Sequence, residues 1–304
     1  MKPPFLVIFL LSAISCFAQK LDGLIIETTK VTLSPYESVE GIDWYYAKEK
    51  YQQTTDDKSW SIEKVWYYSD GLKVAAFVAT PSKLEGKYPL VIFNRGSAVR
   101  NDIAYVHAPL FRELVKHGFV VLAPALRQSE GSEGKDEIGG ADLHDLINIE
   151  KVYKQMTFVD QQNVFMLGES RGGIMTYLAI KEGMKLNAAA TVGAITDFES
   201  YLKDNPWIKP ESIWPEFPQQ RKEICDSRSA LMWPERITVP LLIMNGGDDP
   251  QVRPYYAIHL ANRLSDLKKP YQLKIFQGGN HILSGAATNE RDREVIEWFK
   301  KFVK

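Results

Sequence analysis

Residues 168–172 read Gly-Glu-Ser-Arg-Gly, the pattern G-x-S-x-G, and they directly follow the apolar run 164–167. A helix-like stretch begins near residue 173. A turn of this kind between a strand and a helix holds its serine on a sharp bend with the hydroxyl exposed, as a nucleophile requires. The pattern therefore predicts Ser170 as a nucleophile; the alternative is that Ser170 only caps the helix that follows.

A serine hydroxyl becomes a good nucleophile at neutral pH only when a base accepts its proton. The chain has five histidines, and four of them lie within or beside segments of helical pattern: His107, His117, His144 and His259. The fifth, His281, ends a Gly-Gly-Asn-His loop after the alternating apolar segment 271–276. Catalytic groups of open α/β sheets gather in loops at the carboxyl ends of strands. His281 is therefore the expected base, and an ordinary polar loop residue is the alternative.

An acid must orient the base, and the loop 245–252 supplies two candidates, Asp248 and Asp249, after the apolar segment 239–244. A carboxylate there would accept the imidazole Nδ1–H and stabilise the imidazolium that forms as the serine attacks. An aspartate before Pro250 also fits an ordinary turn. Serine, aspartate and histidine then follow the chain order of α/β-hydrolases, which differs from the orders of chymotrypsin and subtilisin.

Together these motifs resemble α/β-hydrolases related to the catalytic domain of prolyl oligopeptidase. The matching segments cover most of the chain from about residue 61: 127–134, 139–142, 168–173, 246–252 and 278–281. In the G-x-x-D-x-x-V pattern of that family the acid lies three residues after the glycine, which selects Asp249 and leaves Asp248 as the reserve candidate. The resemblance implies a serine hydrolase whose catalytic residues are Ser170, Asp249 and His281.

Acyl transfer also needs hydrogen-bond donors for the oxyanion. The backbone N–H of Arg171 directly follows the nucleophile and is the first donor expected in this fold. The second donor is expected after the apolar strand 88–93. Relatives of prolyl oligopeptidase often use a tyrosine hydroxyl there, whereas this chain has Asn94. The Asn94 side-chain amide or the Arg95 N–H is therefore the candidate for the second donor.

Two arginines near the predicted nucleophile, Arg95 and Arg171, have two interpretations. Their guanidinium groups either bind a substrate carboxylate through bidentate contacts, or they pair with Glu169 or Glu130 and hold loops together. We favour the structural role. Arg171 also stands where proline-cleaving relatives commonly carry an aromatic residue, which argues against specificity for proline.

The order of elements predicts an α/β fold. Segments 61–68 and 72–80 alternate in the manner of strands around a Ser-Asp-Gly turn, which is a hairpin signal. Later strands are expected near 88–94, 118–124, 163–168, 188–194, 239–245 and 271–277, separated by helical segments. This alternation predicts a mostly parallel central sheet with helices on both faces. The resemblance makes it an α/β-hydrolase fold with a small helical lid.

Three parts are expected along the chain: a signal peptide (1–18), an irregular or helical N-terminal extension (19–60), and an α/β-hydrolase domain (61–304) with a lid insertion at about 197–236. The stretch ahead of residue 61 is too short for the propeller of prolyl oligopeptidase, so the resemblance implies that only local loops exclude long polypeptides. The lid contains several large aromatic residues: Trp207, Trp214, Phe217 and Trp233. These either form an apolar pocket over the serine or pack as the core of small lid helices. We favour the second role for Trp233.

The N-terminus predicts export. Lys2 precedes the apolar run 5–11, and small residues follow at the positions that the cleavage rule requires, which places the cut after Ala18. The apolar run is too short to span a membrane. A lipoprotein anchor through Cys16 is the weaker alternative. The expected location is therefore secreted or periplasmic, and Cys225 would be the sole cysteine of the exported chain, without an internal disulfide.

The chain has a formal net charge of −1, no basic run and no repeat, so nothing indicates nucleic acid or a membrane surface as a partner. No metal or organic cofactor is implied. We expect a secreted serine hydrolase that forms an acyl-enzyme, foremost a serine peptidase acting on short peptides. A carboxylesterase acting on small or carbohydrate-linked esters is one alternative. A non-catalytic binding protein is another, which the three intact catalytic residues disfavour. The residues favour no particular oligomeric state.

Overall fold

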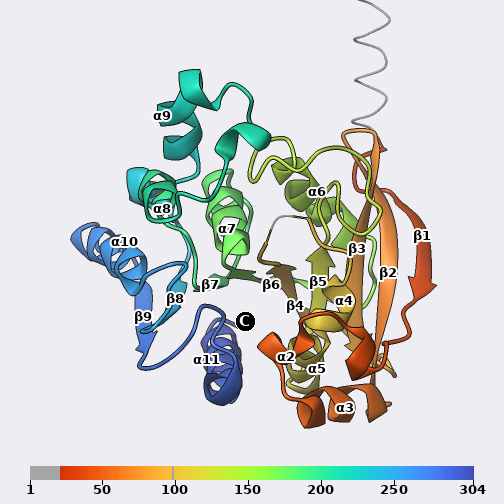
Figure 1. Cartoon of the computed structure of the whole chain (residues 1–304). Helices are drawn as coiled ribbons and strands as arrows, with labels where there is room; N and C mark the ends of the chain where they lie inside the picture. Colours follow the sequence, from red (N-terminus) through yellow and green to blue (C-terminus); the bar gives the residue numbers. More distant parts are fainter. Residues whose placement is uncertain (1–20, 98) are drawn as a thin grey trace, which may run out of the picture.

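The computed structural model of the chain describes residues 21–97 and 99–304; the predicted signal peptide and Cys16 lie outside the described residues. The described residues build a sheet of nine strands with helices on both faces (Figure 1). From edge to edge the strand order is β1-β2-β3-β5-β4-β6-β7-β8-β9. The strands are β1 (Ile25–Lys30), β2 (Trp60–Ser69), β3 (Leu72–Pro81), β4 (Tyr88–Asn94), β5 (Val120–Pro124), β6 (Val159–Glu169), β7 (Ala188–Val192), β8 (Leu241–Gly246) and β9 (Tyr271–Phe276).

The pairing of the strands is antiparallel at one edge and parallel through the rest of the sheet. β1 pairs with β2, β2 with β3, and β3 with β5 antiparallel, and the remaining pairs are parallel. The predicted mostly parallel α/β sheet is therefore confirmed. In the β2–β3 hairpin the turn residues Asp70 and Gly71 have φ angles of 52° and 78°, which suit a two-residue turn that follows the twist of the strands.

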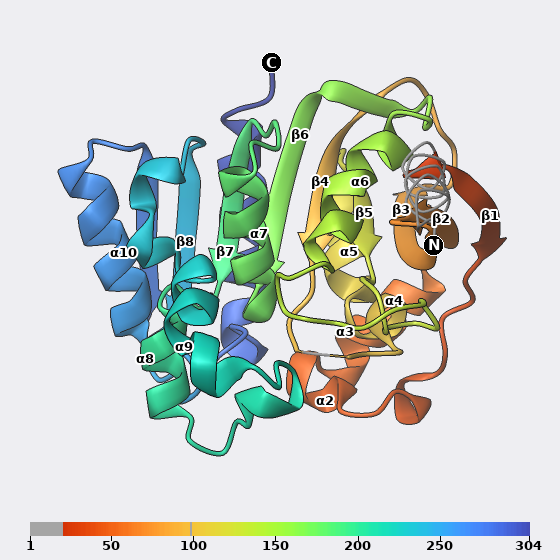
Figure 2. The same ribbon diagram turned by 90° about the horizontal axis from the view of Figure 1, so that it is seen from above.

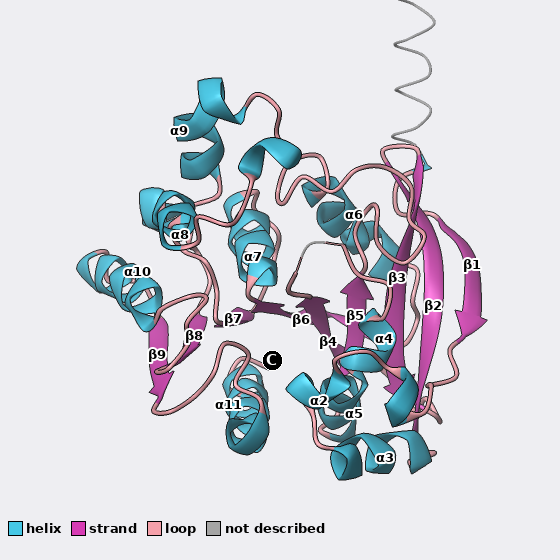
Figure 3. Cartoon of the chain, viewed as in Figure 1, coloured by secondary structure: helices cyan, strands magenta, loops and turns pink. Residues whose placement is uncertain are grey.

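The helices divide between the two faces of the sheet (Figure 3). On one face lie α6 (Leu143–Tyr153), α7 (Arg171–Lys181), α8 (Phe198–Asp204), α9 (Phe217–Ser227) and α10 (Pro254–Asp266). On the other face lie α2 (Ile42–Tyr45), α3 (Lys48–Asp56), α4 (Ile103–Val106), α5 (Ala108–Lys116) and α11 (Thr288–Lys300).

Alternate residues of the central strands enter two separate apolar cores. In β4, Leu90 and Ile92 join the core that contains α6 and α7, whereas Val91 and Phe93 join the core that contains α5 and α11. All four side chains are buried. Parallel strands that are buried on both faces read as continuous apolar runs. This is why the chain shows unbroken apolar segments at the central strands.

The N-terminal extension contains the 3-10 turn 36–38 and the helices α2 and α3, in line with the expected irregular or helical segment, but one part of it differs. Residues 25–30 form β1, which pairs with β2 and adds a strand at the edge of the sheet. Five of its six residues are exposed. An exposed edge strand lacks the apolar alternation that marks a strand with one buried face, which is why the pattern of this segment predicted no strand.

Between β7 and β8 the chain forms α8, α9 and short 3-10 turns at 210–212, 230–232 and 234–236. Seen from above, α8, α9 and α2 lie at the same end of the molecule, where β6 leads into α7 (Figure 2). Trp233 is buried, and its indole N–H donates to the Asp226 carbonyl at 3.0 Å, so it packs within this segment. Trp207, by contrast, is 67% exposed.

Candidate active site

Ser170 lies on the turn between β6 and α7. Its φ and ψ angles of 52° and −118° fall outside the regions that non-glycine residues ordinarily occupy. Its backbone N–H donates to the Val192 carbonyl at 2.8 Å, which fixes the turn to β7. A Cβ on Gly172 would collide with the carbonyl of Asn94, so glycine lets α7 start close to the end of β4. The turn thus has the strained strand-to-helix geometry that G-x-S-x-G predicts.

The loops after β8 and β9 bring Asp249 and His281 to the serine. The His281 Nε2 lies 2.8 Å from the Ser170 Oγ, and Nδ1 lies 2.7 Å from the Asp249 Oδ2. The other carboxylate oxygen, Oδ1, accepts the backbone N–H groups of Gln251 and Val252 at 2.8 and 2.9 Å. Asp249 and His281 are both 4% exposed. The imidazole therefore bridges a hydroxyl and a carboxylate that the main chain holds in place.

Two neighbouring residues shape the surroundings of the imidazole. Asp248, the reserve candidate for the acid, is exposed, and its backbone N–H donates to the Gly279 carbonyl at 3.0 Å. Gly193, which the sequence reasoning did not single out, has a φ of 55°, and a Cβ there would lie 3.0 Å from the His281 Nδ1. The signal for Gly193 was available, because a glycine within a predicted strand often marks a close approach.

The side chains of Asn94 and Arg95 hydrogen-bond to residues other than Ser170, and the backbone N–H of Arg95 remains a candidate for the second oxyanion donor. The Asn94 amide donates to a threonine hydroxyl on α7 at 3.0 Å. The Arg95 guanidinium reaches the loop after β5. The pocket wall beside Ser170 is formed instead by Gly96 and Ser97, and a Cβ on Gly96 would lie 3.3 Å from the Ser170 Cβ. The main chain at Gly96 therefore lies beside Ser170.

A cavity of about 300 Å³ adjoins Ser170, and its walls are mainly apolar. The apolar wall residues come from three parts of the chain: Trp44 and Tyr45 of α2; Ile195, Phe198, Tyr201, Ile208, Ile213 and Trp214 of the segment between β7 and β8; and Ile138, Ile174 and Ile282 elsewhere in the hydrolase domain. A larger groove of about 890 Å³ is lined by charged residues of α3, α5 and α11 and does not include Ser170. The reacting side chains, rather than cavity size, identify the site.

More than half of the sequence matches a known family. Residues 110–304 match the prolyl oligopeptidase family of peptidases. The chain belongs to this family. The protein named Uncharacterized peptidase YtmA, from Bacillus subtilis (strain 168), is 24% identical over 239 residues, which cover 78% of this chain and 92% of YtmA.

Two solved structures share the fold of this family member. A puromycin-hydrolyzing peptidase of Mycobacterium tuberculosis superposes with a TM-score of 0.63 at 21% identity, over 76% of this chain and 37% of that one. The acetyl xylan esterase from Paenibacillus sp. R4 superposes with a TM-score of 0.66 at 15% identity, over 96% of this chain and 94% of that one. The chain thus spans little more than a third of the puromycin-hydrolyzing peptidase. Family and fold together make this prolyl oligopeptidase relative a serine hydrolase.

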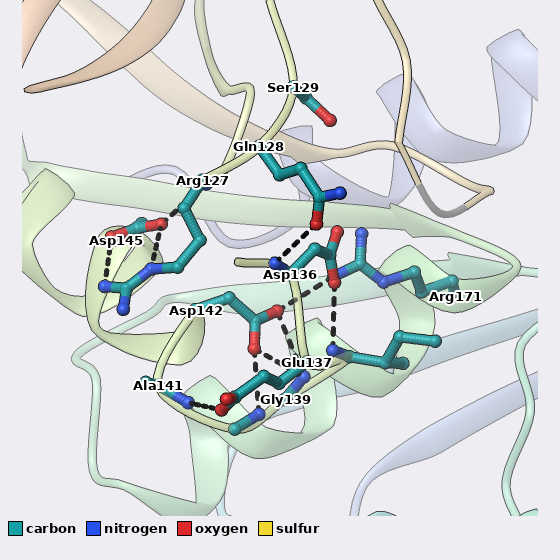
Figure 4. Close-up of polar contacts among 12 residues, drawn as sticks. Arg127, Gln128, Ser129, Asp136, Glu137, Gly139, Ala141, Asp142, Asp145 and Arg171 are labelled. Atoms are coloured by element: carbon teal, nitrogen blue, oxygen red, sulfur yellow. Dashed lines mark hydrogen bonds and ion pairs between the residues drawn. The ribbon is translucent and has the colours of Figure 1, made fainter. Parts of the chain in front are cut away.

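In this member of the prolyl oligopeptidase family, two aspartates hold the arginine that follows the nucleophile (Figure 4). The Arg171 Nη2 lies 2.6 Å from the Asp136 Oδ1 and 2.8 Å from the Asp142 Oδ2. Asp142 also accepts the backbone N–H groups of Gly139 and Gly140. These contacts fasten the loop before α6 to the first residue of α7.

The structural role favoured for the two arginines fits these contacts, but the predicted partners were wrong. Arg171 pairs with Asp136 and Asp142, and the Arg95 Nη2 lies 3.7 Å from Asp136, whereas the sequence pointed to Glu169 or Glu130. The loop 127–142 folds back over the start of α7, and this long-range path leaves no local pattern in the sequence.

A buried histidine, His107, lies close to Glu169, the residue that precedes the nucleophile. The His107 ring packs against Phe93 and Phe111. Burial first, and then the nearby positive charges of Arg100 and other arginines, hold the pKa of His107 well below its ordinary value. Its Nδ1 lies 3.7 Å from the Glu169 carboxylate, but because the ring is neutral at neutral pH this contact is no ion pair there.

We expect His107 to make the folded protein sensitive to acid. Below its ordinary pKa of about 6.5 the unfolded state takes up a proton that the folded state binds only at lower pH, so stability falls as the pH drops from 7 toward 5. Urea unfolding of wild type and of His107→Phe at both pH values measures the effect, with His259→Phe at an exposed position as the control. The prediction fails if His107→Phe loses as much stability on acidification as wild type.

Three further features concern metal ligands, membrane-spanning helices and the cysteine of the described residues. Residues 21–97 and 99–304 contain no cluster of three His, Cys, Asp or Glu side chains placed to hold a metal ion. No helix within the described part combines the length and apolar content needed to cross a membrane. Cys225 is buried, and burial raises the pKa of its thiol to about 12, so this thiol is poorly suited to act as a nucleophile.

Proposed function

We propose that the chain is a secreted serine hydrolase that cleaves peptide bonds of short substrates through an acyl-enzyme on Ser170. The observation that carries the proposal is the contact of His281 with both Ser170 and Asp249, at 2.8 and 2.7 Å. Membership of a peptidase family supports the peptide bond as the target. The signal-peptide pattern of residues 1–18 supports export.

The geometry suits a two-step reaction. His281 Nε2 accepts the Ser170 proton as Oγ attacks the carbonyl carbon, and the resulting imidazolium is stabilised by Asp249. The oxyanion would be bound by the backbone N–H of Arg171, at the start of α7 where N–H groups lack helical partners, and by a backbone N–H of segment 95–97. His281 then protonates the leaving group. Water attacks the acyl-enzyme by the same route and frees the serine.

The cavity supports substrates with an apolar group close to the scissile carbonyl. Ile174, Ile213 and Trp214 contribute apolar wall beside the serine, and about 300 Å³ lies at the small end of ligand pockets. Arg95 and Arg171, the arginines near the nucleophile, both lie within ion-pair distance of Asp136. A small neutral, apolar side chain therefore fits the site better than a charged one.

A carboxylesterase is the second candidate. The superposition on the acetyl xylan esterase extends over nearly the full length of both chains, 96% and 94%, whereas the puromycin-hydrolyzing peptidase is covered over 37%. The same acyl-enzyme chemistry cleaves esters. A non-catalytic binding protein is the third candidate, and the contact of His281 with the serine hydroxyl disfavours it.

Matched substrates test the proposed reaction. The p-nitroanilides and p-nitrophenyl esters of short peptides ending in leucine, phenylalanine or glutamate present the same acyl groups to the enzyme with two kinds of leaving group. The proposal predicts turnover of both bond types, with kcat/KM at least about tenfold higher for the apolar acyl groups than for glutamate. Turnover of esters alone would favour the carboxylesterase, and turnover of neither would favour the binding protein.

A change in the cavity wall is expected to alter specificity. Ile213→Asp places a carboxylate in an apolar wall, and it should lower kcat/KM for leucine and phenylalanine substrates by about ten- to a hundredfold. Met232→Asp is the matched control, because Met232 lies in the same insertion but is 52% exposed and does not line the cavity. Equal losses in the two variants would show that the effect comes from the insertion's stability and not from the cavity.

A further inference from the structure

Arg291 on α11 is 2% exposed. It contacts the loop that carries His281 and the side chain of Glu169. Its Nη1 donates to the Ile282 carbonyl at 2.9 Å and lies 3.6 Å from the Glu169 Oε1. Ile282 directly follows His281, and Glu169 directly precedes Ser170. One guanidinium nitrogen thus connects the main chain beside the base with the side chain beside the nucleophile.

The loop that carries the base depends on such contacts. Residues 277–287 connect β9 to α11, and their regular structure is a single 3-10 turn at 285–287. Gly278 and Leu283 have φ angles of 68° and 55°, so the loop bends sharply on either side of His281. Connecting loops have more freedom than the helices and strands that they join. A donor on the rigid helix α11 restrains this loop directly next to the imidazole.

The N-terminal extension (19–60) and the residue next to Arg291 on α11 also contact its guanidinium group. The Arg291 Nη2 donates to the Tyr46 hydroxyl at 3.2 Å. Nε and Nη2 donate to the Asp292 Oδ1 at 2.9 and 2.7 Å, and the Lys50 Nζ donates to the Asp292 Oδ2 at 3.2 Å. Tyr46 and Asp292 are buried. The guanidinium therefore has little freedom to change its orientation.

We propose that Arg291 is a positioning residue that fixes the distance and orientation of the His281 imidazole relative to Ser170. In this proposal the N-terminal extension supports catalysis, because Tyr46 holds Arg291 in place. The inference rests on the proposed acyl-enzyme function. Arg291 does not line the cavity, so it acts through the residues that touch the substrate. Because a displacement of about 1 Å can lower a rate by about a hundredfold, loss of Arg291 should reduce kcat and leave KM nearly unchanged.

Three variants on α11 test this role. Arg291→Met should lower kcat by about a hundredfold with KM within about threefold of wild type. Arg291→Lys keeps the positive charge but replaces the planar guanidinium group, which donates several hydrogen bonds, and it should lower kcat by about tenfold. Arg293→Met is the matched control, because that side chain is exposed at 60% on the same helix, and it should keep wild-type kcat. The concentration of active sites, counted as the amount of fluorophosphonate bound once labelling is complete, corrects each rate for unfolded protein.

Tyr46→Phe keeps the buried ring and removes only the hydroxyl that accepts from Arg291. It should lower kcat by about threefold or more, with an unchanged melting temperature and an unchanged KM. If Arg291→Met does not fold, Arg291→Lys and Tyr46→Phe decide the question. Wild-type kcat per active site in these two variants, or in Arg291→Met, would overturn the positioning role alone. A wild-type protein that neither reacts with the probe nor turns over any substrate would overturn the proposed function and this inference with it.

Discussion

Ser170→Ala is expected to lower kcat/KM by at least about ten-thousand-fold, because the substitution removes the nucleophile and leaves only binding and the oxyanion donors to act on the substrate. The turn itself should survive. Its φ of 52° suits alanine no worse than serine, and the backbone N–H of residue 170 still donates to Val192. Rates on a p-nitrophenyl ester and a p-nitroanilide measure the loss.

The control for this variant is its fold. Circular dichroism and thermal unfolding of Ser170→Ala should match wild type, because the side-chain contact that it removes is a hydrogen bond to His281 and a single such bond contributes about 1 kcal/mol. A folded Ser170→Ala protein with wild-type turnover would place the chemistry at another residue. If the variant loses turnover only because it unfolds, its melting temperature will be far below that of wild type.

Asp249→Asn is expected to lower kcat by about ten-thousand-fold, close to the effect of removing the serine. The two oxygens of Asp249 have separate partners: Oδ1 accepts from the main chain at Gln251 and Val252, and Oδ2 faces the His281 Nδ1. The asparagine oxygen can keep the main-chain hydrogen bonds, which places the amide nitrogen opposite the imidazole. That nitrogen donates and cannot accept, so the imidazole takes the tautomer whose Nε2 cannot accept the serine proton.

The neighbouring aspartate provides the control for that experiment. Asp248→Asn changes the same chemical group one residue earlier, at an exposed position, and should keep wild-type kcat and KM. Steady-state rates of both variants on the same peptide ester decide between the two aspartates. Full activity in Asp249→Asn, or equal losses in the two variants, would contradict the assignment of the acid.

Ser170, His281 and the loop of the acid could be predicted from local patterns in the sequence, whereas the choice of Asp249 over Asp248 came from the resemblance to the prolyl oligopeptidase family. Ser170 lies between an apolar run and a helical stretch, and the loops of Asp249 and His281 each follow a predicted strand. Parallel strands bring their carboxyl ends to one edge of a sheet, so three separate local patterns predict one meeting point. The parallel strands themselves could be predicted for the same reason, since burial on both faces leaves apolar runs.

Contacts set by tertiary packing could not be predicted in this way. The Asn94 amide donates to Thr176 on α7, and Arg171 pairs with Asp136 and Asp142. Each of these partners depends on how a loop or helix lies across the sheet, and many polar residues in the sequence would have satisfied the same donors. The edge strand β1 was missed for a different reason, because its exposed residues carry no apolar alternation.

The most direct test of the account is covalent labelling of the wild-type protein with a fluorophosphonate, followed by mass mapping of the adduct. The probe reacts with a serine only when a base activates its hydroxyl. The account predicts a single adduct on Ser170, no adduct in Ser170→Ala, and labelling in Asp249→Asn slowed by at least about a hundredfold. A folded wild-type protein that resists the probe, or one whose adduct maps to another serine, would contradict it.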